Sequence, residues 1–155
     1  MKRIFTFAIV LTMCVASVSA IAADMEATQG KLLVIQYDYT TKVRYASGGF
    51  GKRNRDAMMG IQDEFNAHFV FAMEGTGAYV GEVDVTAVQD GIVVMRAVSM
   101  GPWFMVNLPP GTYTITANYD GVAKTQEITV TDTIEKYYFF WNQDEVEYEP
   151  MTTGA

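Results

Sequence analysis

The best-spaced candidate for binding chemistry is the glycine-rich segment Ser47-Gly48-Gly49-Phe50-Gly51, which leads into Lys52 and Arg55. Free backbone amides at the start of a helix attract anions, and nearby cations strengthen that attraction. A phosphate-binding P-loop is excluded, because it requires glycine where Ala46 stands and serine or threonine where Arg53 stands. Glycine is also the default residue where backbones approach, so the favoured interpretation is a tight turn that packs a helix onto a sheet.

Trp103, which follows Gly101-Pro102, is a second candidate for recognition. An amphipathic aromatic side chain at a strand edge contributes heavily when an interface buries it, although core filling is the favoured alternative. If the chain binds a partner, we expect the surface to combine the loop and helix start with the Met100–Trp103 turn. The candidate partner-binding residues are Tyr45, Gly48, Gly49, Gly51, Lys52, Arg55 and Trp103.

His68 is the only histidine of the chain, and an imidazole can act as a general base or as a metal ligand. Its spacing to other residues marks no partner, so a structural or capping histidine is favoured. An enzyme would need a cluster of titratable groups around His68. The sequence therefore predicts no catalytic residue.

Eight methionines follow residue 22, and thioethers together with a histidine can bind Cu(I) in an exported compartment. The sequence contains no Met-x-Met or Met-x-x-Met cluster, so Met58, Met95 and Met105 are expected to pack in the core. Three acidic residues near the end alternate but match no calcium loop: Glu145, Glu147 and Glu149. The sequence therefore predicts no metal site and no cofactor.

The first 22 residues have the layout of a cleaved secretory signal peptide. Lys2 and Arg3 precede an apolar run, and small residues lead to an Ala-x-Ala site that ends at Ala22, with cleavage expected after Ala22 or Ala23. Val18-Ser19-Ala20 is a second candidate cleavage site. The run is shorter than the roughly 20 residues of a membrane span, and no later stretch approaches that length. A soluble periplasmic product is expected, and Met13 directly before Cys14 argues against a lipoprotein.

The charge of the chain argues against nucleic acid and anionic membrane surfaces as partners. The formal net charge is −7, and loss of Lys2 and Arg3 with the signal peptide moves it to −9. Cys14 is the only cysteine, so the exported part can form no internal disulfide. Half of the residues are hydrophobic, which is enough for a core to stabilise a single domain.

Apolar residues that alternate with polar ones indicate strands over most of the chain. Asp90-Gly91 and Asp120-Gly121 supply the positive φ angles of type I′ turns between paired strands, and Pro110-Gly111 marks another turn. This pattern predicts an antiparallel, Ig-like or transthyretin-like β-sandwich with one packed α-helix. Strands are expected at 32–40, 68–73, 79–88, 92–99, 103–108, 112–119, 122–130 and 135–141, and the helix at 52–66.

The predicted organisation follows the chain from its start. It comprises a signal peptide (1–22), an N-terminal strand with the glycine-rich loop (23–51), the helix (52–66), the β-sandwich domain (67–141) and an acidic flexible tail (142–155).

Two motifs carry a resemblance to known proteins. Residues 67–130 resemble the carboxypeptidase regulatory-like domain, a small transthyretin-like sandwich that ends in an apolar strand, L-P-P-G-x-Y-x-I/V-x-A, a glycine turn and a final apolar strand. The matching residues are Trp103–Val106, Leu108-Pro109-Pro110-Gly111, Tyr113, Ile115, Ala117, Gly121, Ile128 and Val130. Small exported bacterial proteins carry a Y-x-S-G-G-x-G element before this domain, matched here at Tyr45, Ser47, Gly48, Gly49 and Gly51. The resemblance implies a non-catalytic accessory or interaction role, and the family offers no agreed functional residues.

The expected function is that of an exported, non-enzymatic accessory module that binds a periplasmic or envelope protein. The alternative is a periplasmic carrier of a small ligand or a metal ion, which predicts ligand-dependent thermal stabilisation. A third hypothesis is an enzyme of unrecognised type built around His68.

Overall fold

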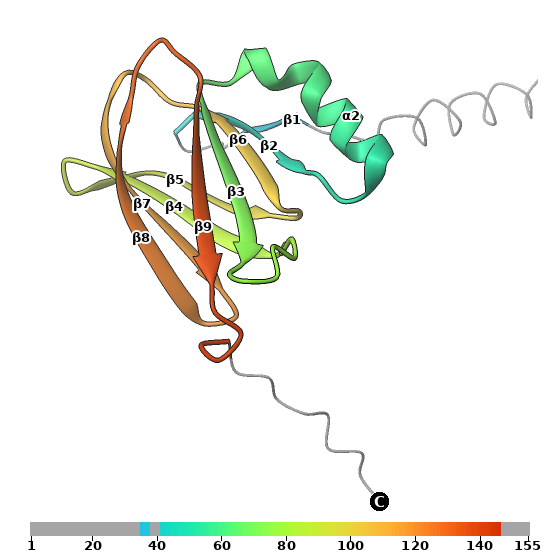
Figure 1. Ribbon diagram of the computed structural model, residues 1–155. Helices are drawn as coiled ribbons and strands as arrows, with labels where there is room; N and C mark the ends of the chain where they lie inside the picture. Colours follow the sequence, from blue (N-terminus) through green and yellow to red (C-terminus); the bar gives the residue numbers. More distant parts are fainter. Residues whose placement is uncertain (1–34, 38–40, 147–155) are drawn as a thin grey trace, which may run out of the picture. The chain divides into compact units, whose positions relative to one another are not determined.

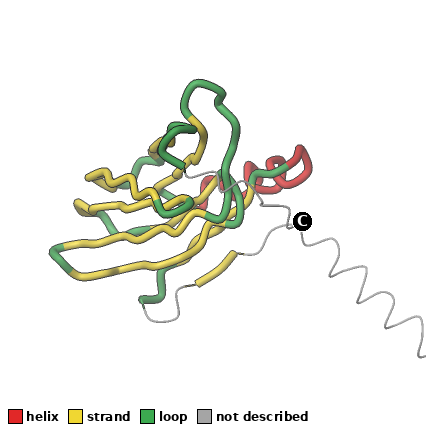
Figure 2. Tube along the Cα trace, turned by 90° about the horizontal axis from the view of Figure 1, so that it is seen from below, coloured by secondary structure: helices red, strands yellow, loops and turns green. Residues whose placement is uncertain are grey.

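Two β-sheets and one α-helix make up the part of the chain that the structure describes. The structure is a computed structural model that describes residues 35–37 and 41–146. The sheets pack on each other and the helix lies outside them, so the predicted β-sandwich with one packed helix is confirmed (Figure 1, Figure 2). The predicted signal peptide (1–22) and the end of the predicted tail (147–155) lie outside the described residues. No helix in the described ranges is long and apolar enough to cross a membrane.

The larger sheet contains the first and the last strand of the described chain. Its strands are β1 (Ile35–Tyr37), β2 (Arg44–Gly48), β3 (Ala67–Met73), β6 (Trp103–Asn107) and β9 (Glu135–Trp141), in the spatial order β1-β2-β6-β3-β9. All neighbours are antiparallel except β3 and β9, which pair in parallel. The chain reaches β9 by crossing over from the other sheet, and such a crossover allows a parallel pair.

The smaller sheet consists of two hairpins. Its strands are β4 (Val83–Gln89), β5 (Ile92–Ser99), β7 (Gly111–Tyr119) and β8 (Val122–Val130), in the order β5-β4-β7-β8. Asp90-Gly91 joins β4 to β5 with φ angles of 51° and 78°, and Asp120-Gly121 joins β7 to β8 with 50° and 80°. The sequence predicts a turn at Pro110-Gly111. Residues 108–110 connect β6 to β7, and Gly111 is the first residue of β7. The local turn chemistry therefore places both hairpins.

The helix is shorter than the predicted range of 52–66. Helix α2 spans Gly51–Ile61, and a single 3-10 turn, η1 (Gln62–Glu64), follows it. Phe65 is already extended, and β3 begins at Ala67. His68 Nε2 lies 3.0 Å from the carbonyl oxygen of Gln62 and 3.1 Å from that of Phe65, so its ring fixes the turn that ends the helix.

The sequence predicts no strand between residues 41 and 67, so β2 is an additional strand, and β4 begins later than predicted. Ser47 and Gly48, expected in the loop, belong to β2, where Ser47 pairs with Phe104 and Gly48 with Trp103 of β6. The strand expected from Tyr79 begins only at Val83, because Tyr79 makes a single isolated bridge to Ala72. The cause is the same in both cases: pairing with a distant strand decides where a strand begins, and local sequence does not encode it.

Aromatic side chains from the larger sheet fill the space between the sheets. Phe69 lies 6.1 Å from Phe104 and 5.9 Å from Phe139 between ring centroids, and Val85 and Ile115 of the smaller sheet are fully buried against this cluster. A separate cluster on the outer side of the larger sheet joins the helix to it through Ala46, Met58, Phe65 and Met105. The expected core positions of Met58, Met95 and Met105 are occupied, at 0%, 0% and 4% exposure.

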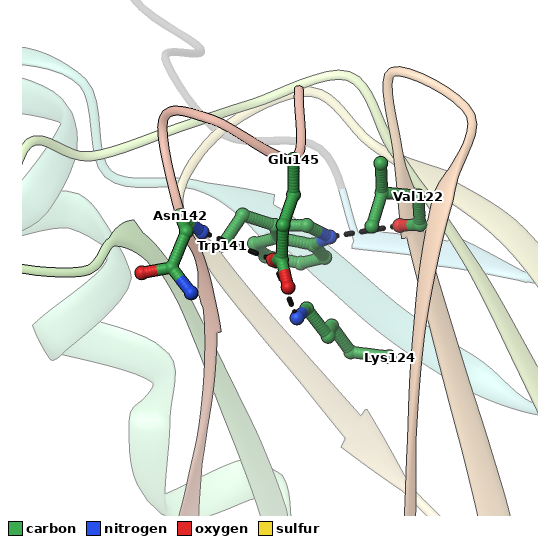
Figure 3. Close-up of polar contacts among 5 residues, drawn as sticks. All are labelled: Val122, Lys124, Trp141, Asn142 and Glu145. Carbon is green, nitrogen blue, oxygen red and sulfur yellow. Dashed lines mark hydrogen bonds and ion pairs between the residues drawn. The ribbon is translucent and has the colours of Figure 1, made fainter. Parts of the chain in front are cut away.

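The first residues of the predicted flexible tail fold back onto the sandwich (Figure 3). Trp141 Nε1 donates to the carbonyl oxygen of Val122 at 2.8 Å, and Lys124 Nζ donates to the Glu145 carboxylate at 2.6 Å. The same carboxylate accepts the backbone N–H of Asn142 at 3.2 Å. The Lys124 hydrogen bond is the main cause of a lowered Glu145 pKa. Residues 142–146 therefore close the edge between β8 and β9.

We predict that Gly121→Ala lowers the free energy of unfolding by roughly 1 kcal/mol, because its φ of 80° disfavours any Cβ. The matched control is Gly60→Ala in α2, where a Cβ meets nothing within 4 Å and helix propensity should add roughly 0.5–1 kcal/mol. Urea unfolding of both variants measures the two changes in the free energy of unfolding. A Gly121→Ala chain as stable as the unchanged one would show that this turn does not need a left-handed residue.

Candidate functional site

The glycine-rich segment packs tightly against the turn before β6. A Cβ on Gly101 would lie 2.3 Å from the carbonyl oxygen of Gly48, and a Cβ on Gly49 would lie 2.9 Å from Cγ of Trp103. Gly49 also has a φ of 103°, which favours glycine. No side chain tolerates such distances, so these glycines are needed for the close approach of two backbones. The geometry supports the favoured interpretation, a tight packing turn.

The polar groups of this segment bond within the fold. Asn54 Oδ1 of the helix accepts the backbone N–H of Gly49, and Arg55 Nη1 donates to the Gly49 carbonyl at 3.4 Å. Ser47 Oγ accepts the backbone N–H of Met100 at 3.3 Å. Because the Gly49 amide already has an acceptor, the segment lacks the central donor of an anion cradle.

The other predicted partner-binding residues divide between the core and the solvent. Tyr45 stacks on Phe104 with ring centroids 5.2 Å apart, on the side of the sheet that faces the sandwich core. Lys52 is exposed and forms an ion pair with Asp56 at 2.7 Å. Gly51 has open space around it. The structure thus brings Gly48, Gly49, Arg55 and Trp103 together and directs Tyr45 into the core.

Large apolar side chains are exposed around Trp103, and we call them the apolar patch. The position of a Cβ on Gly81 is 2.8 Å from both Cε2 of Phe50 and the backbone oxygen of Met100, so these residues meet there. Tyr138 and Phe140 stack on the outer side of β9, with centroids 6.1 Å apart. The members and their exposures are Phe50 (52%), Met59 (48%), Tyr79 (48%), Met100 (60%), Tyr138 (50%) and Phe140 (46%). An apolar gathering of this kind marks binding surfaces.

A cavity of about 180 Å³ opens among three members of the patch, Met59, Tyr79 and Tyr138. Trp103 and Tyr138 line it from the sheet, Tyr79 from the loop before β4, and Met59 from the helix. His68 also lines it and is only 3% exposed. The helix covers Ala46 and Met105 of the outer sheet face, and the cavity lies where that cover ends.

The ring of His68 has a defined tautomer. Its Nε2 lies at hydrogen-bond distance from two carbonyl oxygens, which accept only, so Nε2 carries the proton. Nδ1 then has a lone pair, and it is buried without a hydrogen-bond partner. Burial lowers the His68 pKa and outweighs the two carbonyls, which raise it; Lys136 lowers it further and Asp63 raises it. The structural role expected for His68 is present, together with one unsatisfied acceptor.

The predicted surface includes Phe50 and Met100, whereas the sequence did not identify the other exposed members of the patch. Phe50, Met59 and Tyr79 lie on a helix start, a helix end and a loop, so no periodicity connects them. The available signal was the alternation in β9, which directs Tyr138 and Phe140 away from the core. The lining of the cavity depends on distant pairing and could not be read from spacing.

Comparison with known proteins adds no further constraint, since no protein-family model and no curated protein matches this chain. Among the described residues, no group of three or more His, Cys, Asp or Glu side chains could hold a metal ion. The geometry therefore has to carry the functional argument.

We predict that the stability of the metal-free protein falls as the pH drops below 6.5. The folded pKa of His68 lies below the ordinary value of 6.5, so the unfolded chain binds the proton first and acid favours unfolding. The contribution of His68 is complete above pH 6.5 and is lost as the pH falls through the folded pKa. Urea unfolding between pH 8 and 5 measures it, and His68→Gln should flatten this part of the profile; an unchanged profile in that variant would refute the assignment.

A second prediction concerns the backbone contact beneath Trp103. Gly101→Ala should lower the free energy of unfolding by roughly 1–3 kcal/mol, because the new methyl group overlaps the Gly48 carbonyl. Urea unfolding tests it, with Gly60→Ala as the variant that meets open space. Equal stability of the two variants would contradict a rigid contact.

Proposed function

We propose that this chain is an exported, non-enzymatic binding module that recognises an envelope protein through the apolar patch around Trp103. The observation that carries the proposal is the exposure of large apolar side chains on a base fixed by the Gly48–Gly101 contact. Exposed to water, these side chains add nothing to the free energy of folding. Binding of a partner that covers them is favoured by roughly 25 cal/mol for each Å² of apolar area that is buried.

The charge around the patch supports a partner with an acidic rim. The chain is acidic overall, with a formal net charge of −7, yet basic residues border the patch. Lys52, Arg53 and Arg55 follow Phe50 at the helix start, and Lys136 lines the cavity from β9. A basic border on an acidic chain steers acidic partners toward the patch and excludes basic ones.

The basic start, apolar run and small residues of the first 22 positions support export through a cleaved signal peptide and a periplasmic location. The resemblance to the carboxypeptidase regulatory-like domain supports an accessory role for the sandwich. The alternative, a carrier for a small ligand or metal ion, is favoured by one observation, the cavity with its unsatisfied histidine nitrogen.

We predict that Met100→Ser weakens partner capture at least about tenfold, because an exposed methionine buried in an interface contributes roughly 1.5 kcal/mol or more. The matched control is Ile92→Ser, which removes an apolar side chain of similar exposure, 67% against 60%, at the opposite end of β5. In-cell crosslinking of tagged chains, quantified by mass spectrometry, measures capture. Equal capture by the two variants would contradict recognition by the patch.

The basic border makes a separate prediction. Lys52→Ala with Arg55→Ala should leave the free energy of unfolding within about 0.5 kcal/mol, since the Lys52–Asp56 pair is exposed and the half-buried Arg55 makes only a long hydrogen bond, 3.4 Å, to the Gly49 carbonyl. The same double variant should reduce capture, and added salt should reduce the capture of the unchanged chain. A double variant that unfolds would show that this helix start serves stability alone.

A further inference from the structure

The cavity inside the patch has an unusual set of donor atoms. Its lining contains two thioethers and an imidazole, from Met59, Met105 and His68, and no carboxylate or thiol of the described residues lines it. The remaining lining residues are aromatic, aliphatic or amide side chains, apart from Lys136. Thioether and imidazole donors without hard oxygen ligands suit soft metal ions.

Pairing between strands places two of these donors together. His68 of β3 is directly opposite Met105 of β6 in the antiparallel register, so their side chains lie on the same outer face of the sheet. Met105 is 4% exposed and His68 3%, which keeps both away from solvent. Met59 lines the cavity from the helix and is 48% exposed, so its side chain can move toward a bound ion and become the third ligand.

The hydrogen bonds of His68 match those of a metal-ligating histidine. A ligating imidazole usually donates its other N–H to a backbone carbonyl, which fixes its tautomer and orientation. Here Nε2 lies at 3.0 and 3.1 Å from two backbone carbonyl oxygens, and Nδ1 is buried without a partner. A buried unsatisfied acceptor is destabilising, and a bound cation would remove that cost.

The charge near the cavity restricts which charge the bound ion can carry. Within the part of the chain that the structure describes, Lys136 is the only charged residue that lines the cavity, and it opposes a dication more strongly than a monocation. We therefore propose that Met59, His68 and Met105 form a binding site for a soft monovalent metal ion, Cu(I), with Trp103 and Tyr138 as its aromatic walls. Metal binding at this site is a function in addition to protein recognition, and it does not depend on the proposed protein partner.

The test uses the full chain with Cys14→Ser, which removes its only cysteine, and titrates it with Ag(I) as an air-stable substitute for Cu(I). We expect one ion per chain, NMR shifts of the Met59 and Met105 methyl groups, and a change in His68 Nδ1. Quenching of Trp103 fluorescence, resolved in a Trp141→Phe background, should follow the same titration. Anaerobic Cu(I) with a competing chelator should give the same stoichiometry.

Two methionine variants make the site falsifiable without unfolding the chain. Met59→Leu should weaken Ag(I) binding by at least about tenfold, as loss of a contributor to a metal site does. Met100→Leu changes a methionine of comparable exposure, 60% against 48%, that does not line the cavity, and it should bind as the unchanged chain does. Circular dichroism verifies that both variants fold.

Three outcomes would overturn the proposal. They are the absence of binding, equal binding by Met59→Leu and Met100→Leu, and methyl shifts spread over methionines outside the cavity. Capture of a protein by the patch is measured without added metal, so its failure and the failure of the metal site are seen separately.

Discussion

The contact between the Gly48 and Gly101 backbones is the constraint on which the rest of the outer face depends. It joins the end of β2 to the turn before β6 at a distance that no side chain on Gly101 would allow. Because the helix begins three residues after Gly48, the same contact fixes where α2 starts and where Phe50 emerges. Trp103 packs over Gly49. Three glycines thus position the helix, the tryptophan and the turn that exposes Met100.

The helix covers only part of the sheet that it packs on, and this incomplete cover produces the candidate site. Ala46 and Met105 lie under α2, whereas Tyr138 and Phe140 on β9 remain exposed. His68 lines the cavity at this boundary, where its Nε2 fixes the helix end and its Nδ1 is buried without a hydrogen-bond partner. His68 therefore both stabilises the end of the helix and is a ligand of the proposed metal site. The inner face, by contrast, is a closed aromatic core with no polar group of this kind among the described side chains.

The parts of the fold that sequence predicted are those encoded locally. Asp90-Gly91 and Asp120-Gly121 require positive φ angles wherever the chain goes, so both hairpins followed from their turns. The parallel pairing of β3 with β9 joins residues about 68 positions apart, and turn chemistry says nothing about it. The site was found in part: Gly48, Gly49 and Trp103 meet, whereas Tyr45 enters the core and Met59 and Tyr79 carried no signal.

The central claim, that the apolar patch is covered by a partner, is tested most directly by hydroxyl-radical footprinting in intact cells and on the purified chain. Met59 and Met100 are exposed in the fold, and methionine reports solvent access sensitively. We expect both to be oxidised less in cells than in the purified chain, while labelling of the exposed Ile92 at the far hairpin stays the same. Equal oxidation of Met59 and Met100 in the two settings would contradict it.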